Sequence, residues 1–259
     1  MKTLAFDIST NNTGWSYLNV KKLKIGYSII EHEHGNIAPS MTMTPCMKIY
    51  FFGNRIKELL EKYNPDEVAF EEPILVMGHG FLTARSLARF NGVGMYFAHQ
   101  LIKKEVYSYE PSKWKKSLGL NSTCHKTEVQ LEITKQMNLL SNDVYQKFNS
   151  EIREERKKLD LSLQIETLET EQKKEMAILK EAIKANIPSM SVSVFKEVQK
   201  SEMKKLKEQL KKDKKKLAKE MDKNLVKIGT AIYSETGVNF DVADAYGVNF
   251  CMLKELSII

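Results

Sequence analysis

Acidic residues stand at the ends of two short apolar runs, and they are the residues in this sequence best suited to chemistry. Asp7 follows the run 4–6, and Glu71 and Glu72 follow the run 68–70, after which Pro73 turns the chain away. A carboxylate at the end of a buried strand is costly unless something neutralises it. These acids therefore call for a common explanation.

Two further acids, Asp241 and Asp244, lie three positions apart at the start of a predicted helix, so their side chains point the same way. Mg²⁺ prefers oxygen ligands and keeps several waters, so a few convergent carboxylates can hold one or two ions. Paired ions can activate water for phosphodiester cleavage. The plainer alternatives are that Asp7 caps a turn, that Glu72 is solvated and that Asp241 is only a helix N-cap.

The elements that would position these acids follow from hydrophobic periodicity. Three strands come first as a meander, and strands then alternate with helices, which is typical of an α/β mixed sheet covered by helices. Gly92 and Gly94 are expected to allow close helix packing. The predicted strands are 2–7, 15–20, 25–30, 67–70 and 105–109, and the predicted helices are 49–63, 81–104 and one from about Asp241.

Residues 141–228 differ in composition from the rest, because lysine and glutamate dominate with sparse aliphatics and no glycine. Apolar residues recur at three- and four-residue intervals in two arms, and Pro188 lies in the break between them, which predicts an antiparallel helical hairpin, a short coiled coil. The segment 196–227 holds 13 lysines against 6 acids. The predicted domains are 1–140 with 229–259, and the inserted hairpin 141–228. The apolar positions are Leu161, Ile165, Leu168, Met176, Leu179 and Ile183 in the first arm, and Leu206, Leu210, Leu217, Met221, Leu225 and Ile228 in the second.

Composition sets only broad limits. The chain has 259 residues, 42% of them hydrophobic, and 40 basic against 33 acidic residues, which favours a polyanionic partner only weakly. Cys46, Cys124 and Cys251 show no zinc-ligand spacing. With no apolar signal-peptide core before Asp7 and no long apolar window, we expect a soluble cytoplasmic protein without a membrane segment.

The motifs together resemble a known family. Leu4-Ala5-Phe6-Asp7 with the turn Thr13-Gly14-Trp15, then Val68-Ala69-Phe70-Glu71-Glu72, then Asp241-Val242-Ala243-Asp244-Ala245, is similar in order and spacing to the RuvC family of Holliday junction resolvases. Residues 87–94 resemble the helix after the second motif, and Pro111-Ser112-Lys113 with Lys126 resembles the basic motif. The resemblance covers about residues 1–140 and 229–259.

The resemblance implies an RNase H-like nuclease fold and a site. Asp7, Glu71, Asp241 and Asp244 would bind two Mg²⁺ ions, with Mn²⁺ as a substitute, and Glu71 is preferred over Glu72 because it follows the small-apolar pair. Lys126 would lie near the scissile phosphate, with Lys113 a weaker counterpart; the alternative for Lys126 is an ordinary solvated helix residue. The wider set expected to contact DNA is Lys113, Lys115, Lys116, Lys126, Ile74, Arg85 and Arg89.

The implied partners are branched DNA and a second copy of the chain in a homodimer. Ile74 and Leu75 are a candidate apolar wedge at an opened junction, although core packing is the commoner role of such residues. Residues 196–227 could contact substrate arms or be merely a solvated face.

Two departures from the family stand out: Ile8-Ser9-Thr10 replaces a glycine-containing turn, as in viral variants, and the hairpin is absent from short bacterial forms. The first favours a phage or viral source, and so a host cytoplasm.

Two other functions stay open on the sequence. A sugar-kinase-like ATPase also has an acid-containing first hairpin with a glycine such as Gly14, but it needs two such domains and phosphate loops, which are not evident in this sequence. A catalytically inactive protein could instead bind DNA or a partner through the basic hairpin. Retention of all four acids argues against the second possibility.

Overall fold

The computed structural model describes residues 1–73, 81–158 and 192–259, together with residues 170, 171, 174, 177 and 181. The chain divides into two compact units, one of residues 1–146 and 229–259 and the other of residues 147–228. The candidate wedge, Ile74 and Leu75, and all six apolar positions of the first hairpin arm lie outside the described residues.

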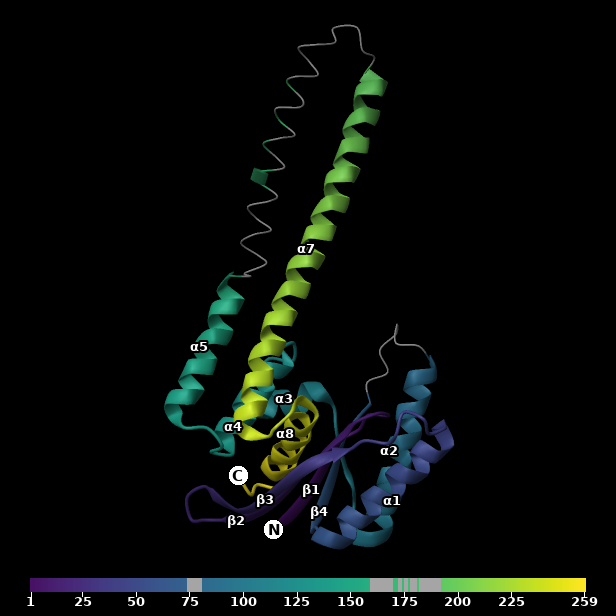
Figure 1. Ribbon diagram of the computed structural model, residues 1–259, viewed down its shortest axis with the longest axis vertical. Coiled ribbons are helices and arrows are strands. Elements are labelled where there is room, and N and C mark those ends of the chain that lie inside the picture. The colour runs from purple at the N-terminus through teal and green to yellow at the C-terminus, as the bar shows by residue number, and fades with distance from the viewer. Residues whose placement is uncertain (74–80, 159–169, 172–173, 175–176, 178–180, 182–191) are drawn as a thin grey trace. The chain divides into compact units, whose positions relative to one another are not determined.

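The first unit is built on a five-stranded mixed sheet with the order β3-β2-β1-β4-β5, which confirms the predicted α/β fold (Figure 1). The pairs β1–β2 and β2–β3 are antiparallel, whereas β1–β4 and β4–β5 are parallel. The strands are β1 (Lys2–Asp7), β2 (Thr13–Lys22), β3 (Tyr27–Ile37), β4 (Glu67–Glu71) and β5 (Tyr107–Tyr109).

The two central strands are apolar because both of their faces are covered. Phe6 of β1 pairs in parallel register with Phe70 of β4, and their rings stack with centroids 5.0 Å apart. Asp7 and Glu71 are the next residues along each strand. Parallel register therefore brings two carboxylates to the same edge of the sheet.

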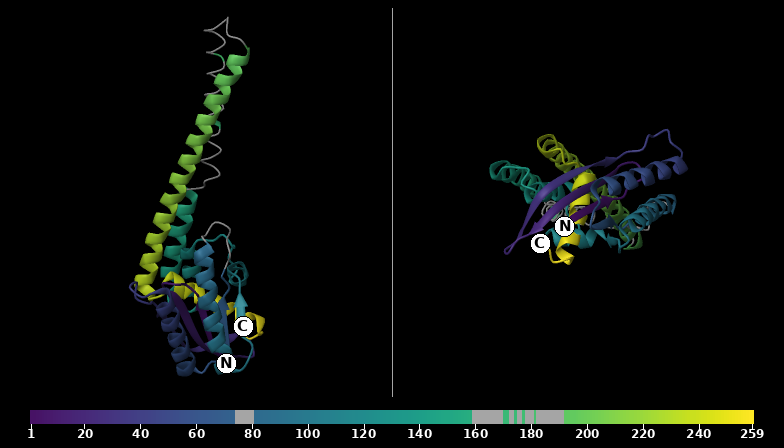
Figure 2. Two further views of the ribbon diagram at one scale, coloured as in Figure 1. Left: turned by 90° about the vertical axis from the view of Figure 1, so that its right-hand side faces the viewer. Right: turned by 90° about the horizontal axis from the view of Figure 1, so that it is seen from below.

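Helices cover both faces of this sheet (Figures 1 and 2). One face packs on α1 (Pro45–Tyr63) and α2 (Phe81–Ile102), in a core that contains Leu4, Phe6 and Phe70. The opposite face packs on α3 (Pro111–Ser117), α4 (Lys126–Gln136) and α8 (Phe240–Glu255), in a core that contains Ala5 and Ala69. Alternate residues of each strand thus serve opposite layers.

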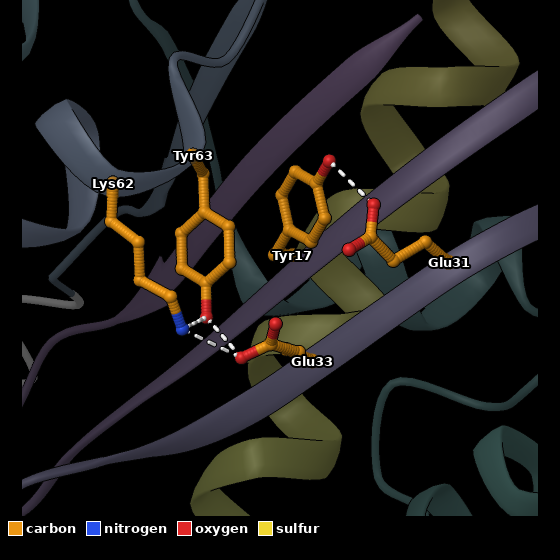
Figure 3. Close-up of polar contacts among 5 residues, drawn as sticks. All are labelled: Tyr17, Glu31, Glu33, Lys62 and Tyr63. Carbon is orange, nitrogen blue, oxygen red and sulfur yellow. Dashed lines mark hydrogen bonds and ion pairs between the residues drawn. The ribbon is translucent and has the colours of Figure 1, made fainter.

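A polar network ties β3 to α1 at the edge of the sheet (Figure 3). Glu33 accepts hydrogen bonds from the Tyr63 hydroxyl at 2.6 Å and from Lys62 Nζ at 2.8 Å. Tyr17 stacks on Tyr63 with ring centroids 4.3 Å apart, and its hydroxyl donates to Glu31 at 3.3 Å. Burial and the neighbouring carboxylates raise the pKa of Tyr17 to about 12, so its hydroxyl remains a hydrogen-bond donor at neutral pH.

Several element boundaries differ from the predicted ones for local reasons. Helix α1 begins at Pro45 rather than at residue 49, because Thr44 caps it and proline is suited to the first helical position. Strand β5 begins only at Tyr107. Gly94 does allow close packing, since a Cβ there would lie 2.7 Å from the Phe70 ring, but a Cβ on Gly92 would meet no described atom within 4 Å.

The second unit contains residues 147–158 of α5 (Asn142–Lys158) and residues 192–228 of α7 (Val192–Thr236). Phe148, Ile152 and Leu225 are buried, and Asn224 donates a hydrogen bond to Glu155 at 3.0 Å. The predicted break at 186–189 lies outside the described residues, so the antiparallel hairpin and the coiled coil stay predictions. Among the described residues, no helix combines the length and the apolar character that crossing a bilayer requires.

Candidate metal centre

Three acids from distant parts of the sequence meet at one end of the sheet. Asp7, Glu71 and Asp244 each offer a carboxylate oxygen, and these oxygens lie within 4.8 Å of one another. Asp7 and Glu71 end the parallel strands β1 and β4, and Asp244 lies in the second turn of α8. Glu72, by contrast, is exposed, and its backbone N–H donates to the carbonyl of Tyr109.

Gly14 makes this convergence possible. It pairs with Asp7 in the β1–β2 ladder, and a Cβ built on it would lie 2.1 Å from the backbone oxygen of Asp241. Only a residue without a side chain allows the N-terminus of α8 to approach the strand so closely. The glycine of the Thr13-Gly14-Trp15 motif is therefore what lets Asp244 reach Asp7.

Asp241 lies beside the three-acid group but is not part of it. It sits in the first turn of α8, where Asn239 is the N-cap and accepts from the backbone N–H of Val242. The carboxylate of Asp241 accepts a hydrogen bond from the side-chain amide of Asn12. The sequence grouped Asp241 with the other three acids, whereas the structure engages it with the β1–β2 turn; its charge still raises the pKa of Asp7.

Burial raises the pKa of all three acids. Burial and then the charge of Glu71 raise the pKa of Asp7 well above its ordinary value. Burial likewise raises the pKa of Glu71 to about 7, and burial with the charge of Asp7 raises that of Asp244 to about 7. Like charges so close together resist simultaneous ionisation unless a cation balances them.

Lys126 faces this group. Its Nζ lies 3.3 Å from Oδ2 of Asp244, and it is the first residue of α4. That helix start is fixed by a capping box in which the His125 side chain and Glu128 satisfy each other's backbone N–H groups. Burial opposes the charged form of Lys126, but the carboxylates of Asp244, Asp7 and Asp241 outweigh it and raise the Lys126 pKa.

The other predicted basic residues lie in different places. Lys113 forms an ion pair with Glu255 at the far end of α8 and lies over the Tyr109 ring, so the structure does not place it with the acids. Lys115, two residues on, is close enough for its charge to lower the pKa of both Glu71 and Asp244. Lys116, Arg85 and Arg89 are exposed, on α3 and α2.

Two features of the site were not found from the sequence. The contact of Asn12 with Asp241 joins residues 229 positions apart, and no local sequence pattern predicts it. The sequence predicts both Lys113 and Lys115 as DNA contacts, but their different placement depends on the orientation of α3, whose buried Trp114 packs against Gly247 of α8. In the sequence alone, Asn12 and Trp114 are indistinguishable from ordinary turn and core residues.

The donor set fits a hard divalent cation. Each of the three acids supplies oxygen, and Oε2 of Glu71 is buried without a hydrogen-bond partner among the described residues. A buried anionic oxygen with no donor carries a large desolvation cost. A Mg²⁺ or Mn²⁺ ion held by Asp7, Glu71 and Asp244 would remove that cost.

Comparison with known proteins gives a consistent set of relatives. The chain is 29% identical over 123 residues to the crossover junction endodeoxyribonuclease RuvC of Alkaliphilus metalliredigens, covering 44% of this chain and 73% of that protein. It is 29% identical over 134 residues to RuvC of Cytophaga hutchinsonii, covering 51% of this chain and 62% of that protein, which is less than two thirds. RuvC of Thermus thermophilus superposes with a TM-score of 0.43 at 20% identity, over 52% of this chain and 79% of that one. The chain matches no protein-family profile.

Proposed function

We propose that this chain, which is similar to crossover junction endodeoxyribonucleases of the RuvC type, is a metal-dependent endonuclease that cleaves phosphodiesters in branched DNA, with Holliday junctions as its main substrate. The observation that carries the proposal is the convergence of Asp7, Glu71 and Asp244 from three separate elements. Three carboxylates so close together repel one another and destabilise a fold, so their presence favours a role that needs them.

In this proposal the residues of the site have separate roles in binding the metal and the phosphate. Asp7, Glu71 and Asp244 hold the divalent ion or ions, and Asp241, oriented by Asn12, completes the acidic rim. When bound, Mg²⁺ supplies positive charge at the scissile phosphate and lowers the pKa of water. Lys126 neutralises Asp244 in the metal-free chain, and an ion at Asp244 would leave its ammonium available to offset charge on the phosphate.

Basic side chains of α2 and α3 would orient the DNA backbone. Residues that contact phosphates must be accessible to the DNA. Arg85, Arg89 and Lys116 are exposed, and Lys115 is half-buried. The exposed lysines of α7, including Lys211, would add contacts to substrate arms. Assembly as a homodimer, two ions rather than one, and action in a host cytoplasm as a phage protein are further parts of this proposal.

The decisive experiment is cleavage of an end-labelled four-way junction in Mg²⁺, compared with a linear duplex of the same sequence. The native chain should cut the junction and spare the duplex, and Asp7→Asn should bind the junction without cutting it. Asp143→Asn is the matched control, because Asp143 is exposed on α5, and it should cut normally. Equal cutting by Asp7→Asn, or equal cutting of duplex and junction by the native chain, would overturn the proposal.

The hairpin lysines have a separate test. If α7 binds phosphates, replacing Lys211, Lys212, Lys215 and Lys216 by glutamine should reduce the slope of log affinity against log salt by about 0.9 for each phosphate that the variant no longer neutralises. An unchanged slope would show that these lysines form only a solvated face.

A further inference from the structure

A cleft of about 280 Å³ opens in the first unit between the β1–β2 turn, the start of α1 and the N-terminal half of α2. Thr10 and Asn11 line it from the turn, Lys48 from α1, and Ser86 and Phe90 from α2. None of the three acids of the metal centre lines it. It is therefore a separate hollow with its own chemistry.

The lining combines apolar and polar side chains. Phe90 is 3% exposed and is held against Phe52, with ring centroids 5.0 Å apart, and Met43 also lines the cleft. Three hydroxyl-bearing residues, Thr10, Thr83 and Ser86, also line the cleft. Nucleobases have apolar faces that pack on aromatic and thioether groups, and polar edges that hydroxyls and amides can read.

The charge of the cleft suits a nucleotide as well. Lys48 is the charged residue among the described residues that line it, so the cleft is locally basic. Lys48 Nζ donates to Oδ1 of Asn11 at 2.9 Å, which fixes both the lysine and the turn. An ammonium carries three N–H donors, so donors remain for a phosphate or base oxygen.

The β1–β2 turn connects this cleft to the metal centre. Asp7 precedes the turn, Thr10 and Asn11 line the cleft, and Asn12 donates to Asp241. Three residues span at most about 10 Å. A DNA strand with its scissile phosphate at the acids would therefore pass the cleft within a few nucleotides.

We propose that this cleft binds one unstacked nucleotide of the cleaved strand next to the scissile phosphate, and that it sets the base preference of cutting. The inference rests on the proposed function and deepens it, since it assigns the choice of cutting position to residues outside the metal centre. Phe90 and Met43 support the base. Ser86, Thr83 and Lys48 contact its polar edge.

The test uses the full-length chain and a set of four-way junctions that differ only in the bases flanking the branch point, with cut positions mapped at single-nucleotide resolution. The native chain should prefer certain bases. Ser86→Val and Thr83→Val should each change the ratio of preferred to non-preferred cutting by about fivefold or more, the range expected for one base contact. Thr83 is exposed, so its variant keeps the test valid should Ser86→Val fail to fold.

Matched controls separate the cleft from general effects. Lys48→Met should change the base preference, whereas Lys57→Met, on the same helix but paired with Glu61 outside the cleft, should not. Ser234→Val, on exposed α7 surface, is the control for the hydroxyl variants. Unchanged preference in Ser86→Val, Thr83→Val and Lys48→Met overturns the cleft assignment while junction cutting itself continues.

A binding measurement distinguishes the two possible failures. In Asp7→Asn without metal, 2-aminopurine placed at the preferred position should change its fluorescence on binding, and Lys48→Met in that background should reduce the change at least fivefold. Equal signals in both chains overturn the cleft assignment. A native chain that binds junctions but never cuts them overturns the proposed function, and with it the role of the cleft in cutting.

Discussion

Substitution of Gly14 by alanine tests how the metal centre is assembled. A Cβ at this position would lie 2.1 Å from the backbone oxygen of Asp241 and 2.3 Å from its carbonyl carbon. Both atoms belong to backbone, so neither can rotate away, and α8 must retreat by more than about 1 Å to restore ordinary contact. Overpacking of this kind costs about 1–3 kcal/mol of folding free energy, and a 1 Å misplacement of catalytic groups can cost about a hundredfold in rate.

Two measurements on Gly14→Ala check this reasoning. The denaturant midpoint should fall by the equivalent of about 1–3 kcal/mol, and junction cleavage in saturating Mg²⁺ should fall at least tenfold. Gly92→Ala is the control, because its Cβ meets no described atom within 4 Å and helix propensity predicts a gain of about 0.5–1 kcal/mol. Native stability and native rate in Gly14→Ala would refute the close approach of α8 to β2.

Three further predictions concern the charges of the site. Lys115→Met should lower junction cleavage about tenfold or more, whereas Lys113→Met, which loses an exposed ion pair with Glu255 and a contact with the Tyr109 ring, should change it little. The reverse order in a rate assay would restore Lys113 to the site. Burial raises the pKa of Glu71 and Asp244 to about 7, so the folded metal-free chain binds more protons than the unfolded chain between about pH 4 and 7. The free energy of unfolding should therefore fall as pH rises through that window. Urea titrations across the window should show this fall. Asp7→Asn should flatten the fall and raise metal-free stability at pH 8, whereas a steeper fall in the variant would count against mutual repulsion among the three acids. Asn12→Leu removes the donor to Asp241 and should lower the cleavage rate about tenfold, and an unchanged rate would show that Asp241 needs no such orientation.

The sequence predicted the parts of the site that depend on local pattern. Asp7 and Glu71 follow fully apolar runs, and such runs are typical of central strands buried on both faces. Parallel strands side by side then bring their terminal acids together. Asp244 was predicted from its helical spacing and from the resemblance to a known family.

What the sequence could not supply depends on tertiary contacts. The engagement of Asp241 by Asn12 and the pairing of Lys113 with Glu255 both follow from how α8 and α3 dock on the sheet. The helix α4 was not predicted, although its start carries a readable signal, since Glu128 stands three residues after the N-cap. His125 occupies the N-cap position where serine or threonine is usual, so the sequence does not match the usual capping-box pattern.

The extension of β3 beyond its predicted end has a similar origin. β3 continues to Ile37 through a polar stretch that contains His32 and His34, which alternation alone does not mark as strand. Those histidines contact the hydroxyl of Tyr246 on α8, at 3.4 and 3.1 Å respectively. Packing against α8, rather than intrinsic strand propensity, therefore extends the hairpin.

The most direct test of the shared metal centre is titration of the full-length chain with Mn²⁺ by calorimetry at pH 8, followed by the same titration of Asp7→Asn and Asp244→Asn. If the acids at the ends of β1 and β4 and in α8 form one centre, the native chain should bind the ion, and each variant should lose at least tenfold in affinity while keeping its fold. Equal affinity in the native chain and in both variants would contradict a shared metal centre.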